Sequence, residues 1–315
     1  MRILALTWPT EDKEGLMLNR RRDLLCPAID GITDELLKLG HSVVYVNLAA
    51  DCCEYEPADL GRPAWISGLP FYRWHDIRNK NFDLVWHAIK DPTPSQALPY
   101  VERVMQELDS RIPVFNSATH LQDHTKRKYL PLLAEKTVGV PILDRYSAME
   151  TEDGRLDVKK CHAPSNGAYV SLDRQAIRLH AKNSSRHSLD VDGITLKYQD
   201  NVGRIEPGLR SFFRVPFAAG RCLPGFRYFC PADILCPKSG NAVKTEPFEI
   251  DGTPAGTISA AMKELGVDIA HIEGVNIGPA SVQVFDVNPF PSSYGRSLTP
   301  MSVQIAKRVT QALDL

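Results

Sequence analysis

The chain has 315 residues, of which 43% are hydrophobic and 24% are charged, a composition that excludes a disordered, fibrous or disulfide-stapled protein. At roughly 150 residues per domain, this length predicts two packed units or three small ones. Lys and Arg number 37 and Asp and Glu 38, so the net charge of −1 argues against a surface that binds nucleic acid or membrane over its whole extent.

The first 115 residues alternate apolar strands with amphipathic helices. Strands are predicted over 3–8, 43–46, 82–89 and 112–115, and helices over 27–39 and 96–108. Because parallel strands need helical crossovers, we expect an α/β domain with a parallel sheet covered by helices. Residues 47–81 fit no period and are predicted to form loops. The absence of GxGxxG and GxxxxGK[ST] motifs argues against a dinucleotide-binding or P-loop domain.

From residue 116 onward, this alternation stops. A helix is predicted over 123–138, where Pro131 should divide it and Gly139 should end it. The other predicted elements are strands over 157–161, 168–172, 194–198, 211–217, 269–275 and 282–287, and helices over 257–265 and 299–313. This order predicts an α+β region with mostly antiparallel strands.

The seven cysteines have neither framework nor CxxC spacing, which indicates reduced thiols. Zinc held by Cys222, Cys230 and Cys236 is a weak alternative, because no CxxC pair occurs among them. His120 and His124 are four apart and could pair on a helix face for zinc, but the Glu of an HExxH motif does not follow His120. The sequence contains no signal peptide and no apolar run long enough to span a membrane. We therefore expect a soluble, cytoplasmic protein.

The segment 264–294 is the most informative part of the sequence. Asp286 and Asn288 are two residues apart on a predicted strand, so their side chains should emerge on the same face. Glu273 lies on the preceding strand, and the turn between them allows the two strands to pair as a hairpin. Oxygen-only ligands of this kind suit Mg²⁺ bound together with substrate phosphates. The sequence therefore predicts a magnesium site, the alternative being polar strand ends that face solvent.

This pattern resembles the metal-binding end of the ATP-grasp superfamily, which includes D-alanine–D-alanine ligase, glutathione synthetase and RimK-type amino-acid ligases. Their closing motif is an acid, one residue and Asn-Pro, and here it reads Asp286-Val287-Asn288-Pro289. The resemblance implies that Glu273 and Asp286 bind or bridge Mg²⁺ and that Asn288 completes the second metal site. Mn²⁺ is the alternative metal.

The motifs ahead of it occur in the family's order. Val-Phe-Asn-Ser at 114–117 resembles the I-N-S before the central domain, Asp123 to Lys126 resembles the D-K that opens its first helix, and 140–143 resembles its hP.T strand. The resemblance implies an N-terminal α/β domain with a parallel sheet over 1–115. It further implies an α+β ATP-grasp fold of two mostly antiparallel subdomains over 116–200 and 201–315.

The resemblance also assigns nucleotide-binding residues. Lys126 and Lys160 would meet the ATP phosphates, although the loop after Lys160 holds one glycine, Gly167, where the family often has two or three. Asp200 would hold the ribose. Arg214 would act in catalysis with Lys160 by stabilising the transferring phosphate, since its guanidinium offers a fixed fork of donors.

Further residues are assigned less directly. Arg210 and Arg227 are alternatives to Arg214, and ordinary surface charge is the alternative for both of them. Ser292 and Arg296 follow the metal motif and would hold the substrate carboxylate. His87 and the pair Trp74-His75 could face substrate, because substrates reach the first domain's loops in this family, but packing in the core or at the surface is favoured.

The resemblance implies an ATP-dependent ligase that joins a carboxylate to an amine or thiol through an acylphosphate and releases ADP and phosphate. Its partners would be a small-molecule carboxylate and amine, with a homodimer left open and neither nucleic acid nor membrane. The main alternative is a non-catalytic ATP-grasp-like protein that binds a nucleotide or a small acid. A glycosyltransferase is a third hypothesis, suggested by the α/β first half alone.

Overall fold

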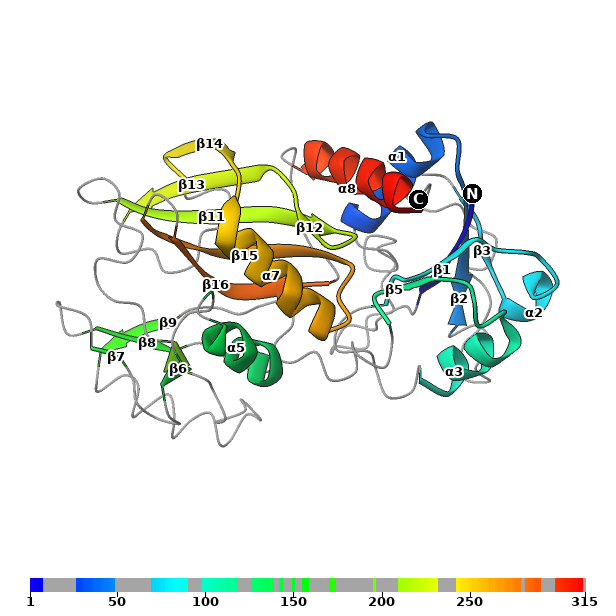
Figure 1. Cartoon of the computed structure of the whole chain (residues 1–315), viewed down its shortest axis with the longest axis horizontal. Coiled ribbons are helices and arrows are strands. Elements are labelled where there is room, and N and C mark those ends of the chain that lie inside the picture. The colour runs from blue at the N-terminus through cyan, green and yellow to red at the C-terminus, as the bar shows by residue number, and fades with distance from the viewer. Residues whose placement is uncertain are drawn as a thin grey trace.

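The protein contains a parallel sheet and a larger antiparallel sheet that lie beside each other, with the C-terminal helix between them (Figure 1). This computed structural model describes residues 1–7, 27–48, 69–89, 98–117, 126–136, 138, 142–143, 149–150, 155–158, 170–173, 195–196, 209–231, 242–278, 281–289 and 298–313. None of the helices within these ranges is both long and apolar enough to cross a lipid bilayer.

The parallel sheet has the strand order β3-β2-β1-β4-β5, and every neighbouring pair in it is parallel. Its strands are β1 (Arg2–Thr7), β2 (Ser42–Asn47), β3 (Phe71–Tyr72), β4 (Leu84–His87) and β5 (Val114–Phe115). The four strands predicted from the sequence are confirmed. The loop predicted over 47–81 is wrong in part, since it contains β3 and the short helix α2 (Trp74–Ile77). Both are too short to show a period in the sequence.

Helices cover both faces of this sheet. Helices α1 (Pro27–Lys38) and α8 (Leu298–Leu313) share one hydrophobic cluster, and α2 and α3 (Leu98–Glu107) pack in the cluster on the other face. Helix α1 ends as predicted, because Gly40 adopts a φ of 83° that L side chains rarely adopt. The last helix of the chain therefore contributes to the core beside the first sheet, which local sequence patterns do not indicate.

The antiparallel sheet has the order β14-β13-β11-β15-β16, with β12 paired to the end of β11. Its strands are β11 (Leu209–Ala218), β12 (Arg221–Cys222), β13 (Gly225–Pro231), β14 (Lys244–Phe248), β15 (Ile269–Gly278) and β16 (Ser281–Asn288). Helix α7 (Gly252–Glu264) lies across it (Figure 1). The antiparallel arrangement and the final hairpin are as predicted, whereas β12, β13 and β14 were not predicted.

Smaller elements precede this sheet in the chain. Helix α5 (Lys126–Glu135) is continuous, so the predicted division at Pro131 is wrong. The proline is the sixth of its ten residues, where it removes one hydrogen-bond donor without ending the helix. Two small antiparallel sheets follow. They are formed by β6 (Ile142–Leu143) with β10 (Thr195–Leu196), and by β7 (Met149–Glu150), β8 (Arg155–Val158) and β9 (Val170–Asp173).

Gly274 is required by close packing in the large sheet. A Cβ atom at this position would lie 2.4 Å from Cζ of Phe213 and 2.4 Å from the carbonyl oxygen of Gln283. Gly274→Ala should therefore lower the free energy of unfolding by about 1–3 kcal/mol. The matched change Gly256→Ala in α7, where no atom lies within 4 Å, should be stabilising because alanine is the better helix former. Urea titration of both variants measures these changes in the free energy of unfolding. Equal unfolding midpoints for the two variants would contradict the packing argument.

Candidate active site

Three charged side chains form a row across β11, β15 and β16 of the antiparallel sheet. Arg214 on β11 pairs directly with Glu273 on β15, and Glu273 pairs directly with Asp286 on β16. Residues directly opposite each other in antiparallel strands point to the same face of the sheet. The pairing register therefore brings together a cation and two carboxylates that are distant in the sequence.

Arg214 forms an ion pair with Glu273 within this row. Its Nη2 atom lies 2.6 Å from Oε1 of Glu273, and the two side chains are 26% and 16% exposed. Burial alone would lower the pKa of Arg214, but the negative potential of Glu273, Tyr228 and Asp286 outweighs it and raises that pKa above its ordinary value. The site thus contains a permanently charged guanidinium whose orientation is fixed by a carboxylate.

Asp286 is held from the other side by helix α5. The hydroxyl group of Tyr129 donates a hydrogen bond of 2.7 Å to Oδ1 of Asp286, and Tyr129 is buried. Lys126 is the first residue of α5 and precedes Tyr129 by three positions. Since residues three apart lie on the same side of a helix, the backbone places Lys126 one turn from the residue that contacts Asp286. The side chain of Lys126 is outside the described atoms.

Asn288 lies on the same face two residues further along β16. It pairs directly with His271 on β15, which is buried. Burial, together with the positive charge of Arg214, lowers the pKa of His271 to about 3. The imidazole is therefore neutral at physiological pH, and Arg214 remains the cation of this part of the site.

The donor set fits a magnesium ion. Glu273, Asp286 and Asn288 share one face of the β15–β16 pair and offer only oxygen atoms, as Mg²⁺ prefers. A carboxylate that accepts a hydrogen bond on one oxygen has a second oxygen that can bind a metal. Among the residues that the structure describes, no group of three or more His, Cys, Asp or Glu side chains is arranged to hold a metal ion.

The zinc alternative finds no support in the described part of the chain. Cys222 and Cys230 are both in the reduced form. Cys222 lies opposite Phe217 and Cys230 lies opposite Arg210, so the two cysteines are about 23 Å apart along β11 and cannot share one metal ion. Cys236, His120 and His124 lie outside the described residues.

Comparison with solved structures identifies the fold of the chain. No protein-family model matches the sequence, and no curated protein is detectably similar to it. Solved structures are similar over nearly the whole chain. The ATP-grasp ligase PsnB, complexed with minimal precursor, Mg and ADP, is 13% identical at a TM-score of 0.57, with 99% of this chain and 98% of that chain covered. The chain has the ATP-grasp fold.

Two further structures agree with this assignment. The macrocyclase MdnC from Microcystis aeruginosa MRC, bound with its precursor peptide MdnA, is 10% identical at a TM-score of 0.56, covering 99% of this chain and 100% of that chain. D-cycloserine synthetase DcsG is 15% identical at a TM-score of 0.54, covering 99% of each chain. These likenesses establish the fold and confirm the resemblance to ATP-grasp proteins seen in the sequence.

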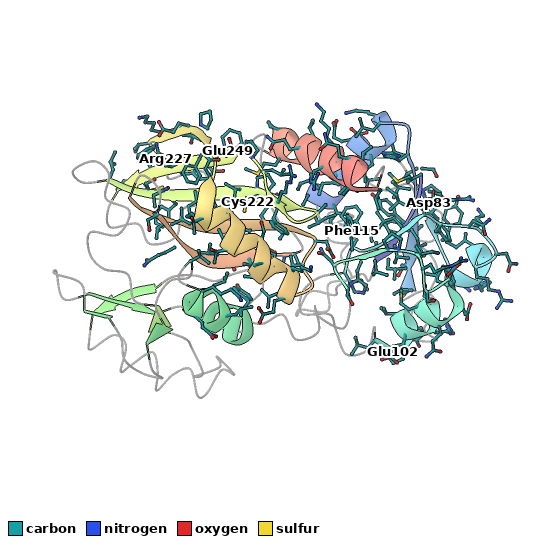
Figure 2. All side chains as sticks on the ribbon, in the orientation of Figure 1. Asp83, Glu102, Phe115, Cys222, Arg227 and Glu249 are labelled. Carbon is teal, nitrogen blue, oxygen red and sulfur yellow. The ribbon has the colours of Figure 1, made fainter. Side chains whose placement is uncertain are left out.

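The structure distinguishes Arg214 from one of its alternatives. Arg227 lies directly opposite Phe213, so it is on the other face of the ATP-grasp sheet from Arg214. Its guanidinium is paired with Glu246. Figure 2 shows Arg227 beside β13 and β14. The side chain of Arg227 therefore points away from the face that carries Glu273 and Asp286. The side chain of Arg210 is not described.

Several predicted site residues lie outside the described residues. They are Lys160, Asp200, Ser292 and Arg296. His87 and Trp74 are described, and both pack in the core as favoured from the sequence: they are 2% and 1% exposed, and the indole of Trp74 donates a hydrogen bond to Glu107. Tyr129 is a site residue that the sequence analysis missed, although its i+3 spacing from Lys126 was visible.

Proposed function

We propose that this ATP-grasp protein is an ATP-dependent ligase that joins a carboxylate to an amine through an acylphosphate and releases ADP and phosphate. The observation that carries the proposal is the row Arg214–Glu273–Asp286 on the face that also carries Asn288. One cation and an oxygen-only set of ligands are what a site for Mg²⁺ and a transferring phosphate requires. The ATP-grasp fold supports the same conclusion, because the similar structures include ATP-grasp ligases.

The roles follow from the chemistry of each group. When bound, Mg²⁺ would neutralise the charge that develops on the β- and γ-phosphates. Glu273, Asp286 and Asn288 would hold the metal, and Arg214 would orient the phosphoryl group by two parallel hydrogen bonds. Lys126 and Lys160 would contact the phosphates, with Lys160 acting beside Arg214 in catalysis.

The remaining roles concern the ends of the substrates. Asp200 would hold the ribose of ATP, and Ser292 with Arg296 would hold a substrate carboxylate.

The reaction would have two steps. In the first step a carboxylate oxygen attacks the γ-phosphorus, the bond to the β-phosphate oxygen breaks, and ADP leaves. In the second step an amine attacks the acyl carbon, loses a proton and expels inorganic phosphate.

The range of acids to be tested follows from the structural neighbours. PsnB and MdnC are described in complexes with precursor peptides, and DcsG is a D-cycloserine synthetase. We therefore propose that the carboxylate of this chain's substrate belongs to a small acid, an amino acid or a peptide. A panel of substrates needs both classes.

Nucleotide analysis over such a panel tests the proposal. With Mg²⁺, ATP, the right acid and an amine, the expected products are ADP and phosphate, because the metal and cations are proposed to gather at the β- and γ-phosphates. AMP with pyrophosphate would defeat the mechanism. ATP binding without turnover across the whole panel would favour the non-catalytic alternative.

A further inference from the structure

Asn116 joins three separate segments of the protein. It directly follows β5 of the parallel sheet, is 0% exposed, and has a φ of 58°. Its backbone N–H donates a hydrogen bond of 2.9 Å to Oδ2 of Asp268, just before β15. Phe115, its neighbour, lies on the side of the first sheet that faces the large sheet (Figure 2). Asn116 is thus one point where the first sheet is attached to the strands of the site.

The amide group of Asn116 uses its full hydrogen-bonding capacity in this attachment. Its Oδ1 accepts from the backbone N–H groups of Asp268 at 2.7 Å and Ile269 at 2.9 Å. Its Nδ2 donates to the carbonyl oxygen of Ile269 at 2.8 Å and to that of Pro289 at 3.2 Å. Two donors and two acceptor positions are all that an amide side chain has.

Asparagine meets the requirements of this position better than any other residue. A φ near 60° is tolerated by Asn, Asp and Gly and disfavoured for most other side chains. Aspartate lacks the two N–H donors, and glycine lacks the side chain altogether. Because the groups that Asn116 contacts are buried, losing their partner leaves unsatisfied polar atoms, which is costly.

The bond to Pro289 connects this attachment to the metal ligands. Pro289 follows Asn288 directly, and Asn288 is the last residue of β16. Beyond Asn288 the strand pairing ends, so the carbonyl of Pro289 is the next backbone group that holds this end of β16 in place. We propose that Asn116 is a positioning residue that fixes the metal-binding end of β16, and this rests on the proposed function of Asn288 as a ligand.

The test measures metal affinity rather than stability alone. Mn²⁺ binding in the presence of ADP, followed by electron paramagnetic resonance, is compared for the wild type, Asn116→Asp and the control Val104→Ala. Asn116→Asp keeps the acceptors and the tolerance for positive φ, but it loses both donors and adds a negative charge, whereas Asn116→Gly removes the amide group without adding charge. Val104 is a buried residue of α3 on the far face of the parallel sheet, so its truncation lowers stability without touching β15 or β16.

Asn116→Asp should weaken Mn²⁺ binding by roughly tenfold or more, as residues that orient metal ligands do. It should also raise the KM for Mg²⁺ more than it lowers kcat, and Val104→Ala should lower the melting temperature with unchanged Mn²⁺ affinity. If Asn116→Asp fails to fold, Asn116→Gly replaces it, since glycine adopts the same φ and leaves room for water. A folded variant with wild-type Mn²⁺ affinity overturns the proposal, and a wild type that binds no Mn²⁺ with ADP overturns the metal site itself.

Discussion

Replacing Asp286 by asparagine should abolish Mg²⁺-dependent turnover while the protein remains folded. Asp286 is proposed to bind the metal directly, and an amide removes its charge without changing its size. The amide oxygen can still accept the hydrogen bond from Tyr129, so the contact between α5 and β16 is kept. We expect turnover to fall by at least about a hundredfold, or roughly 3 kcal/mol of transition-state stabilisation.

The control for this variant is Asp109→Asn. Asp109 is an exposed residue after α3 whose carboxylate pairs with Arg111, and this change also removes one negative charge. Turnover of Asp109→Asn should equal that of the wild type, because surface ion pairs contribute little. ADP release is measured for both variants at saturating Mg²⁺ and ATP. Activity of Asp286→Asn within about threefold of the wild type would remove Asp286 from the metal site.

Replacing Arg214 by methionine should destabilise the metal-free protein and abolish turnover. The change leaves the carboxylate of Glu273 without its ion-pair partner in a half-buried position beside Asp286. Removing one partner of a buried pair costs several kcal/mol, and about 2 kcal/mol is expected here because both side chains retain some contact with solvent. Adding Mg²⁺ should recover more of the melting temperature in Arg214→Met than in the wild type, since the metal replaces the missing positive charge.

Two further variants separate this effect from a general loss of charge. Arg227→Met also removes an arginine from an ion pair of similar exposure, with Glu246, but on the opposite face of the sheet. It should retain turnover and show no additional Mg²⁺ stabilisation. The double variant Arg214→Met/Glu273→Gln should be more stable than Arg214→Met alone, because it removes the unpaired charge. An Arg214→Met protein with an unchanged melting temperature would contradict the proposed electrostatics of the row.

The sequence predicts those elements whose pattern is local. Strands β15 and β16 consist largely of apolar residues, and a turn separates the two strands. This local pattern predicts the hairpin and its three polar residues. Strands β13 and β14 were missed because charged, proline and cysteine residues interrupt their apolar pattern. These strands are stabilised by pairing with β11 and with each other, which a local pattern does not contain.

The same distinction applies to the site. Glu273, Asp286 and Asn288 are candidate ligands predicted from their spacing within one hairpin. Tyr129 was missed because it contacts a residue 157 positions away, and its i+3 spacing from Lys126 alone does not reveal that partner. The hydrogen bonds of Asn116 likewise span 152 to 173 positions. The resemblance to the ATP-grasp family predicts that Arg214 lies near the phosphates, whereas its ion pair with Glu273 follows from the register of β11 and β15.

Transfer of an oxygen atom from the acid to phosphate tests the central claim most directly. The acid that supports ADP release in the substrate panel is labelled with ¹⁸O in its carboxylate and incubated with Mg²⁺, ATP and the amine. If an acylphosphate forms, one labelled oxygen must leave with the phosphoryl group, so inorganic phosphate carrying a single ¹⁸O atom is expected by mass spectrometry. Label in AMP would show attack at the α-phosphate, and unlabelled phosphate alongside a labelled product would show that the carboxylate is never phosphorylated; either result would contradict the proposed ligase.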